Sequence, residues 1–213
     1  MRKHHDEGHF YELYSLVHDY TMLGTDRIRG LYDAVMTAVE QKIPGDIVEC
    51  GAARGGSAAL MGLTLNDAKS DKRLWVCDTF EGIPEATGDD PPEALAYTGQ
   101  FKGSVEEVEH LFIRLGIADN ARLVKGLFQD TLPTLSVDQI AVLHLDGDWY
   151  ESTKCGLECL YDKVVPGGII QIDDYGHWAG CRKAYNDFFF KRNFIPILTS
   201  LDYTGVQFVK GAS

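Results

Sequence analysis

Residues 47–60 read IVECGAARGGSAAL, in which an apolar run ends at Glu49 and Cys50 and is followed by small residues. The apolar run is typical of a buried strand, and a helical pattern begins near Ser57. Glycines between the two let the backbone turn tightly, so that backbone amides and a helix N-terminus face a ligand. The glycine spacing differs from the G-x-G-x-x-G fingerprint of dinucleotide-binding proteins. The alternative interpretation is an ordinary strand-to-helix turn that binds nothing.

Strands and helices alternate on both sides of this turn. The apolar runs are at residues 46–50, 73–77, 121–125, 140–145 and 167–172, and the helical patterns between them are at 56–68, 104–116 and 151–163. This succession predicts right-handed crossovers and a mostly parallel sheet with helices on both faces. A helix at 179–192 then precedes two strands, within 194–200 and 203–210. A closing antiparallel hairpin on such a sheet resembles the class I methyltransferases in fold, so we expect a seven-stranded, Rossmann-like α/β protein.

Bulk composition restricts the class of protein. The chain has 213 residues, 45% of them hydrophobic, and a formal net charge of −12. This length fits a single domain, residues 1–213. The acidic balance repels phosphate backbones and anionic membranes, so neither nucleic acid nor a membrane is expected as a partner. No apolar run is long enough to span a bilayer, and no signal-peptide core begins the chain. The five cysteines lack zinc spacing and suit a reduced, cytoplasmic protein.

Two segments stand apart from the alternating pattern. Residues 10–42 read as two helices broken near TMLGTD, where Thr25 or Asp26 is expected to cap the second, and residues 1–44 are expected to form an N-terminal helical cap. Residues 81–103 (EGIPEATGDDPPEALAYTGQFKG) show neither a helical nor a strand pattern. Loops of this length are typical of functional lids or of disorder. The position after the second strand, at the ligand end of the sheet, favours a lid.

Asp78 ends the second predicted strand, in the stretch LWVCDTFEGIP. An acid at this position can accept two hydrogen bonds from the ribose hydroxyls of a nucleoside that lies across the sheet edge. The alternative is an aspartate that initiates a turn, which is common. The glycine turn after the first strand favours the ribose role.

Four aspartates follow the fourth and fifth predicted strands, in LHLDGDWYESTK and GGIIQIDDYGHW: Asp146, Asp148, Asp173 and Asp174. Because parallel strands end at one edge of a sheet, these acids share the edge that carries the glycine turn. Crowded carboxylates raise one another's pKa values. A divalent cation relieves that repulsion, and oxygen ligands suit magnesium, calcium or manganese. The alternative makes two of the acids helix caps and leaves the others solvated.

The spacing of the four acids predicts their roles. Asp146 and Asp148 are two apart, so their side chains point the same way if the extended backbone persists through Gly147. Asp173 and Asp174 are adjacent, so they converge only where the strand has ended. We expect Asp173 and Asp174 to be metal ligands, one of the first pair to complete the set, and the other to be the general base. Asp146 is favoured as base and Asp148 as ligand, although the two can exchange roles or Asp146 can serve as both.

Longer blocks of sequence resemble the macrocin O-methyltransferase family over about residues 20–190: YTMLGTDRIRGLYDAV, GDIVECGAARGGS, DTFEGIP, KGSVEEV, LDGDWYEST and IDDYGHWAGCRKAYNDF. Members of that family are metal-dependent class I methyltransferases that methylate sugar hydroxyls of antibiotics and other glycosides. The resemblance implies the following roles: Glu49, Gly51 and Ser57 on the S-adenosylmethionine turn, Asp78 at the ribose, Ser104 near the adenine, and Asp146, Asp148, Asp173 and Asp174 at the metal and base positions. The chain departs from the family in its brief amino-terminal region, which leaves the acceptor open.

Residues and resemblance together predict an O-methyltransferase that depends on S-adenosyl-L-methionine and on Mg²⁺ or another hard divalent cation. Its expected partner is a small-molecule hydroxyl acceptor, a sugar or a glycosylated natural product, and a homo-oligomer is left open. One alternative is a catechol-type O-methyltransferase with a flat aromatic acceptor. The others are a nucleotide-binding dehydrogenase, which the glycine spacing disfavours, and a non-catalytic binding module, which has no need of four gathered aspartates.

Overall fold

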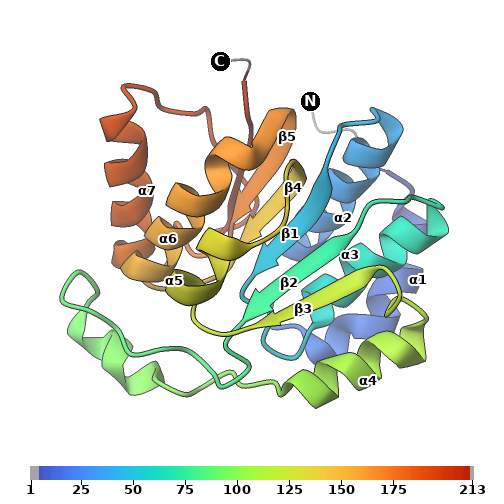
Figure 1. Cartoon of the computed structure of the whole chain (residues 1–213), viewed down its shortest axis with the longest axis horizontal. Coiled ribbons are helices and arrows are strands. Elements are labelled where there is room, and N and C mark those ends of the chain that lie inside the picture. Colours follow the sequence, from blue (N-terminus) through green and yellow to red (C-terminus); the bar gives the residue numbers. More distant parts are fainter. Residues whose placement is uncertain (1–4, 212–213) are drawn as a thin grey trace.

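The computed structural model describes residues 5–211 and contains a seven-stranded sheet with the order β3-β2-β1-β4-β5-β7-β6 (Figure 1). The strands from β3 to β5 pair in parallel, whereas β7 pairs antiparallel with both β5 and β6. The strands are β1 (Asp46–Cys50), β2 (Leu74–Asp78), β3 (Ala121–Lys125), β4 (Ile140–Leu145), β5 (Val164–Ile172), β6 (Thr199–Ser200) and β7 (Val206–Val209). This arrangement confirms the predicted α/β class with its closing hairpin.

Helices cover both faces of the sheet (Figure 1). One apolar core lies under α1 (Glu7–Val17), α2 (Thr25–Glu40), α3 (Gly56–Asp67) and α4 (Val105–Leu115), and the other under α5 (Phe128–Thr131), α6 (Tyr150–Leu160) and α7 (Ala179–Lys191). Short 3₁₀ helices are at His18–Tyr20, Pro92–Tyr97, Leu132–Thr134 and Tyr161–Lys163. Every residue of β4 is buried, because a central parallel strand is covered on both faces and is therefore apolar without alternation.

Polar side chains nevertheless cross the sheet in one row, in register: Glu49 on β1, His144 on β4, Gln171 on β5 and Gln207 on β7. Gln171 Nε2 donates to the carbonyl of Arg27 at 3.2 Å, and Gln207 Nε2 donates to that of Gly30 at 3.2 Å. A Cβ at Gly30 would lie 2.8 Å from Gln171 Oε1, so the glycine lets α2 lie this close to the sheet. These bonds hold the first turns of α2 against the sheet.

The start of α2 differs from the prediction. Its N-cap is Gly24, which makes no side-chain capping bond, and both Thr25 and Asp26 lie inside the helix. The expectation that one of these two residues caps the helix was therefore wrong. The Gly24 carbonyl accepts the N–H of Ile28 at 3.1 Å, which is the first helical bond and requires no side chain.

Two other segments also depart from the sequence pattern. The strand expected within residues 194–200 is confined to Thr199–Ser200. Pro196 has no N–H to donate to a ladder, which is consistent with the late start of the strand. The segment 81–103 was expected to be without helix, but it contains the 3₁₀ helix Pro92–Tyr97. Proline at the start of that helix loses no hydrogen bond, because the first N–H groups of a helix have no partner within it.

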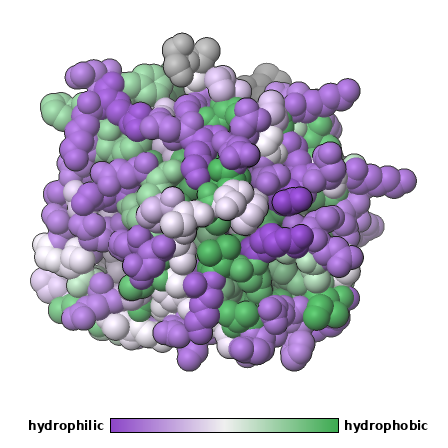
Figure 2. Space-filling view, viewed as in Figure 1, coloured by the Kyte–Doolittle hydropathy of each residue, from purple (hydrophilic) through white to green (hydrophobic). Residues whose placement is uncertain are grey.

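Hydrophilic side chains cover most of the face shown in Figure 2, with an apolar area in its lower centre. The charged residues that contribute to this surface make up 24% of the chain, an ordinary content for a globular protein. Within residues 5–211, no helix has the length and apolar character needed to cross a bilayer.

We predict that Leu143→Ala in β4 lowers the free energy of unfolding by about 2–5 kcal/mol, because Leu143 is fully buried and its truncation leaves a cavity. Leu16→Ala on α1 is the matched control, since Leu16 is 49% exposed. Its expected effect is below about 1 kcal/mol. Urea denaturation followed by circular dichroism measures both. Equal losses for the two variants would contradict the assignment of β4 to the core.

Candidate active site

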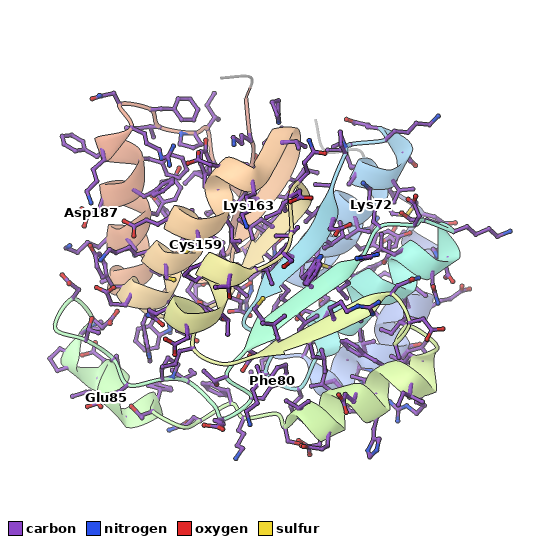
Figure 3. The ribbon with its side chains drawn as sticks, in the orientation of Figure 1. Lys72, Phe80, Glu85, Cys159, Lys163 and Asp187 are labelled. Carbon is purple, nitrogen blue, oxygen red and sulfur yellow. The ribbon has the colours of Figure 1, made fainter. Side chains whose placement is uncertain are left out.

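A cavity of about 220 Å³ lies at the carboxyl edge of the parallel strands. In Figure 3, Phe80, which follows β2, lies at this edge, and Lys72 lies at the opposite one. The predicted site residues that line the cavity are Gly51, Asp78, Asp146, Asp148, Asp173 and Asp174. The structure thus brings these residues together from the ends of β1, β2, β4 and β5.

The glycine turn after β1 is in contact with the end of β4. Gly51 has φ 93°, and a Cβ at this position would lie 1.8 Å from the carbonyl oxygen of Asp146. The Asp146 N–H also donates to the Cys50 carbonyl at 2.8 Å. Only glycine fits here, for reasons of both backbone conformation and space. The turn and the first aspartate therefore form one rigid unit.

Asp78 fixes the same turn from the other side. Its Oδ2 accepts the N–H groups of Ala52 at 2.7 Å and Ala53 at 3.0 Å, and its Oδ1 accepts the N–H of Phe80 at 2.6 Å. The Thr79 hydroxyl also lies 3.3 Å from Oδ1, so four contacts occupy the roughly four lone-pair positions of this carboxylate, and a ligand would have to replace the longest of them. Its role at a ribose stays a prediction, and the structure adds a role in shaping the turn.

The two aspartates after β5 face different neighbours. Asp173 forms an ion pair with Arg27, whose Nε also donates to Asp202 Oδ2 at 2.9 Å. Asp174 Oδ2 accepts the N–H of Asp148 at 3.1 Å. Both side chains line the cavity, as expected if the strand has ended before them.

The pair after β4 reaches the cavity through a turn. β4 ends at Leu145, and Asp148 has φ 56°, in the left-handed region. The strand has therefore ended before Asp146 and the backbone is turned at Asp148, and both side chains line the cavity. Asp148 Oδ1 accepts the indole N–H of Trp178 at 3.1 Å.

The pKa values of three carboxyl groups in the cavity are raised. Withdrawal from water, and then the neighbouring carboxylates, raise the pKa values of Asp146 and Asp174 well above their usual range. Burial raises the pKa of Asp148 to about 7, although the hydrogen bond from Trp178 lowers it. Burial and crowding therefore disfavour the ionised forms of these three carboxyl groups.

The residues present fit a divalent cation. Asp173 Oδ1 and His144 Nε2 are buried 3.7 Å from each other, and neither forms a hydrogen bond with another group in residues 5–211. Together with the Asp146 carboxylate they offer ligand atoms that lie within 4.8 Å of one another. His144 Nδ1 lies 2.9 Å from Glu49 Oε1, which orients the ring. A cation would satisfy the lone polar atoms and relieve the repulsion among the acids.

Three predicted cofactor-binding residues do not line the cavity: Glu49, Ser57 and Ser104. Glu49 is fully buried and bonded to His144, because its side chain belongs to the polar row beneath α2. Ser57 is 3% exposed, in the first turn of α3. The Ser104 hydroxyl caps α4 by accepting the N–H of Glu107 at 3.2 Å. The roles assigned to these three residues at a cofactor stay predictions.

Several lining residues were not found in the sequence: Met22, Leu23, Arg27, Leu127, Phe128 and Gln129. Residues 127–129 follow β3, so the rule that parallel strands end at one edge, if applied to the third strand, would have found them. No comparable sequence rule identifies Arg27, because it does not follow a strand. It reaches the cavity because α2 packs closely on β5, which a sequence pattern does not show.

The segment 81–103 closes one side of the cavity, which Ile83, Pro84 and Phe101 line. The indole N–H of Trp149 donates to the Pro84 carbonyl at 2.8 Å. Asp90 Oδ1 accepts the N–H of Tyr150, the first residue of α6, at 2.8 Å. The segment is therefore packed on the start of α6, next to the aspartates.

Comparison with known proteins points to one class. Residues 15–210 match the family model described as macrocin-O-methyltransferase (TylF). The 8-demethyl-8-(2,3-dimethoxy-alpha-L-rhamnosyl)-tetracenomycin-C 4'-O-methyltransferase of Streptomyces olivaceus is 38% identical over an alignment of 194 residues, and the match covers 88% of this chain and 74% of that protein. The demethyldecarbamoylnovobiocin O-methyltransferase of Streptomyces niveus is 36% identical with the same coverage. The mycinamicin III 3''-O-methyltransferase of Micromonospora griseorubida is 33% identical over an alignment of 202 residues, and the match covers 91% of this chain and 79% of that protein.

Solved structures agree with these sequence relatives. The O-methyltransferase NovP superposes with a TM-score of 0.83 at 33% identity, over 91% of this chain and 83% of that chain. The calicheamicin methyltransferase CalS11 superposes with a TM-score of 0.73 at 19% identity, over 98% and 95% of the two chains. The second likeness concerns the fold alone.

We predict that Asp146→Asn and Asp173→Asn each weaken the binding of Mn²⁺ by at least roughly 10–100-fold, the loss typical even of residues that only support metal ligands. Asp187→Asn on α7, whose carboxylate is 42% exposed, is the control and should bind Mn²⁺ as the wild type does. Electron paramagnetic resonance of free Mn²⁺ measures the affinities. Equal affinity in all variants would show that the cluster holds no cation.

Proposed function

Because the chain belongs to the macrocin-O-methyltransferase family, we propose that it methylates a sugar hydroxyl of a glycosylated natural product, using S-adenosyl-L-methionine and Mg²⁺ or another hard divalent cation. The protein is an O-methyltransferase, as its family and named relatives are. The observation that carries the finer proposal is the convergence of the glycine turn and four aspartates on one cavity. A methyl donor and a metal-held hydroxyl need such adjacent sites.

The proposed donor site follows the ends of β1, β2 and β3. Asp78 accepts from the ribose hydroxyls, and residues 127–129 lie beside the adenine, with Ser104 in the neighbouring α4 cap. The Gly51 turn and the N-terminus of α3, which carries Ser57, favour the methionine carboxylate, because helix N-termini attract anions. Glu49 supports this turn from beneath, through its bond to His144.

The proposed metal ligands are Asp146, Asp173 and Asp174, and the proposed base is Asp148. This exchanges the roles that the sequence favoured for Asp146 and Asp148. The exchange is supported by the grouping of Asp146 with Asp173 and His144 within 4.8 Å. Neither Asp148 nor Asp174 belongs to that group, and Asp174 is kept as a proposed ligand because it lines the same cavity beside Asp173. The exchange is supported also by the indole bond to Asp148, which engages one carboxylate oxygen.

The bound cofactor and cation would supply one part of the methyl-transfer chemistry, and residues of the chain supply the other. S-adenosyl-L-methionine supplies an electrophilic methyl group, and a divalent cation lowers the pKa of a nearby hydroxyl. Asp148 accepts the proton of the acceptor hydroxyl. The Gly51 turn and Asp78 orient the donor, and the two reactants gain most of their reactivity from being held in line. The segment 81–103 acts as a lid that excludes water.

The proposed place of action is the reducing cytoplasm. All five cysteines are free: Cys50, Cys77, Cys155, Cys159 and Cys181. Burial raises the pKa of the Cys181 thiol well above its usual range, which keeps it unreactive.

Calorimetric titration with S-adenosylhomocysteine, and separately with NADH, tests the donor. We expect S-adenosylhomocysteine to bind one site per chain and NADH to bind none, because Asp78 and the glycine turn suit a nucleoside but the G-x-G-x-x-G spacing for a pyrophosphate is missing. Binding of NADH alone would overturn the proposal. Transfer of radiolabelled methyl to sugar-bearing rather than catechol acceptors tests the acceptor class.

We predict that Asp148→Asn lowers kcat by about 10²–10⁴-fold, the usual contribution of a general base, and leaves Mn²⁺ affinity unchanged. Asp146→Asn should instead weaken Mn²⁺ binding and regain part of its activity at high metal concentration. Steady-state kinetics over a range of metal concentrations separates the two. The opposite pattern would restore Asp146 as the base.

A further inference from the structure

The backbone at Asp148 is held in a conformation that few residues adopt. Its φ of 56° is in the left-handed region. The Asp148 N–H donates to Asp174 Oδ2 at 3.1 Å, and the next N–H, that of Trp149, donates to the Gly147 carbonyl at 2.6 Å. Such conformations persist where several contacts fix them, and they cluster at functional sites. The turn therefore fixes the direction in which the Asp148 side chain leaves the backbone.

The Asp148 carboxylate is itself held by one donor. The Trp178 indole N–H lies 3.1 Å from Asp148 Oδ1. An indole donates only, so it cannot exchange roles with the carboxylate. Among residues 5–211, no protein donor forms a hydrogen bond with Asp148 Oδ2. The tryptophan thus engages one oxygen and leaves the other for a ligand in the cavity that Asp148 lines.

Three segments fix the indole in turn. Trp178 is 8% exposed, and its own N–H donates to the Asp174 carbonyl at 2.9 Å at the start of α7. Its ring packs edge-on against Trp149 at 4.9 Å and against Tyr97 at 5.4 Å between ring centroids. Tyr97 belongs to the segment 81–103. The direction of the indole N–H is therefore set by packing from α6, α7 and that segment.

We propose that Trp178 is a positioning residue, whose indole N–H holds Asp148 Oδ1 so that Oδ2 faces the acceptor hydroxyl. The inference rests on the proposed function, in which Asp148 is the base. Trp178 does not line the cavity, so it acts through Asp148 and contacts neither reactant. A base that is free to rotate spends less time in line with the proton, which lowers turnover without changing substrate binding.

The variant Trp178→Phe tests this, because it keeps an aromatic ring and removes the N–H. We expect kcat to fall by roughly 10–100-fold, within the range seen when a reacting group is misplaced. The KM values and the affinities for S-adenosylhomocysteine and Mn²⁺ should stay within about twofold of the wild type, since none of those ligands loses a contact. A double variant with Asp148→Asn should be no slower than Asp148→Asn alone, because the tryptophan acts only through that carboxylate.

Trp75→Phe is the matched control. The Trp75 indole donates to Asp46 Oδ2 at 2.9 Å, and this bond lies at the amino end of the strands, away from the cavity. The same substitution breaks the same kind of bond there, and kcat should not change. If Trp178→Phe does not fold, benzothienylalanine at position 178, which replaces the indole N–H with sulfur in the same shape, removes the bond without the loss of volume.

Distinct outcomes would overturn the inference and the proposed function. Wild-type kcat in a folded variant that lacks the N–H, alongside an inactive Asp148→Asn, would overturn the role of Trp178 alone. So would parallel losses of Mn²⁺ affinity and kcat, because they indicate a structural defect. A wild-type protein that binds no S-adenosylhomocysteine would instead overturn the proposed function itself.

Discussion

Five carboxylates line one cavity, those of Asp78, Asp146, Asp148, Asp173 and Asp174, and Arg27 is the basic side chain that lines it with them. Burial and then the neighbouring negative charges raise the pKa values of Asp146, Asp148 and Asp174, and crowding of this kind opposes the compact fold. The ion pair of Arg27 with Asp173 offsets part of that cost. Hydrogen bonds from the Asp148 N–H and the Trp178 indole offset more. A divalent cation would neutralise the negative charge that remains.

The same acids are held by close packing of the strand ends. Gly51 touches the Asp146 carbonyl so closely that no side chain fits between them, and Asp78 accepts from the two amides that follow Gly51. The proposed donor site and the proposed metal site therefore share atoms of one turn. This contact opposes any shift of the end of β1 against the end of β4, which keeps the two proposed sites at a fixed separation.

The polar row beneath α2 extends this coupling into the core. Glu49 is bonded to His144, and His144 Nε2 lies 3.7 Å from Asp173 Oδ1. Burial opposes protonation of His144, but the two carboxylates dominate and raise its pKa to about 9. Glu49, which belongs to the glycine-turn motif, thus supports Asp173, a proposed metal ligand, through His144. Because the Glu49 side chain is fully buried, it does not line the cavity itself.

The sequence by itself determined the order of strands and helices, the parallel sheet and the edge at which Asp78 and the four later aspartates meet. Those features follow from local periodicity and from one topological rule, that parallel strands end together. The tertiary structure decided which atoms of these residues are free. Ser104 serves as a helix cap, Asp148 lies in a turn and is bonded to Trp178, and Arg27 arrives from a helix far away in the chain. Such choices depend on contacts between segments distant in sequence, whose distances and directions no local pattern contains.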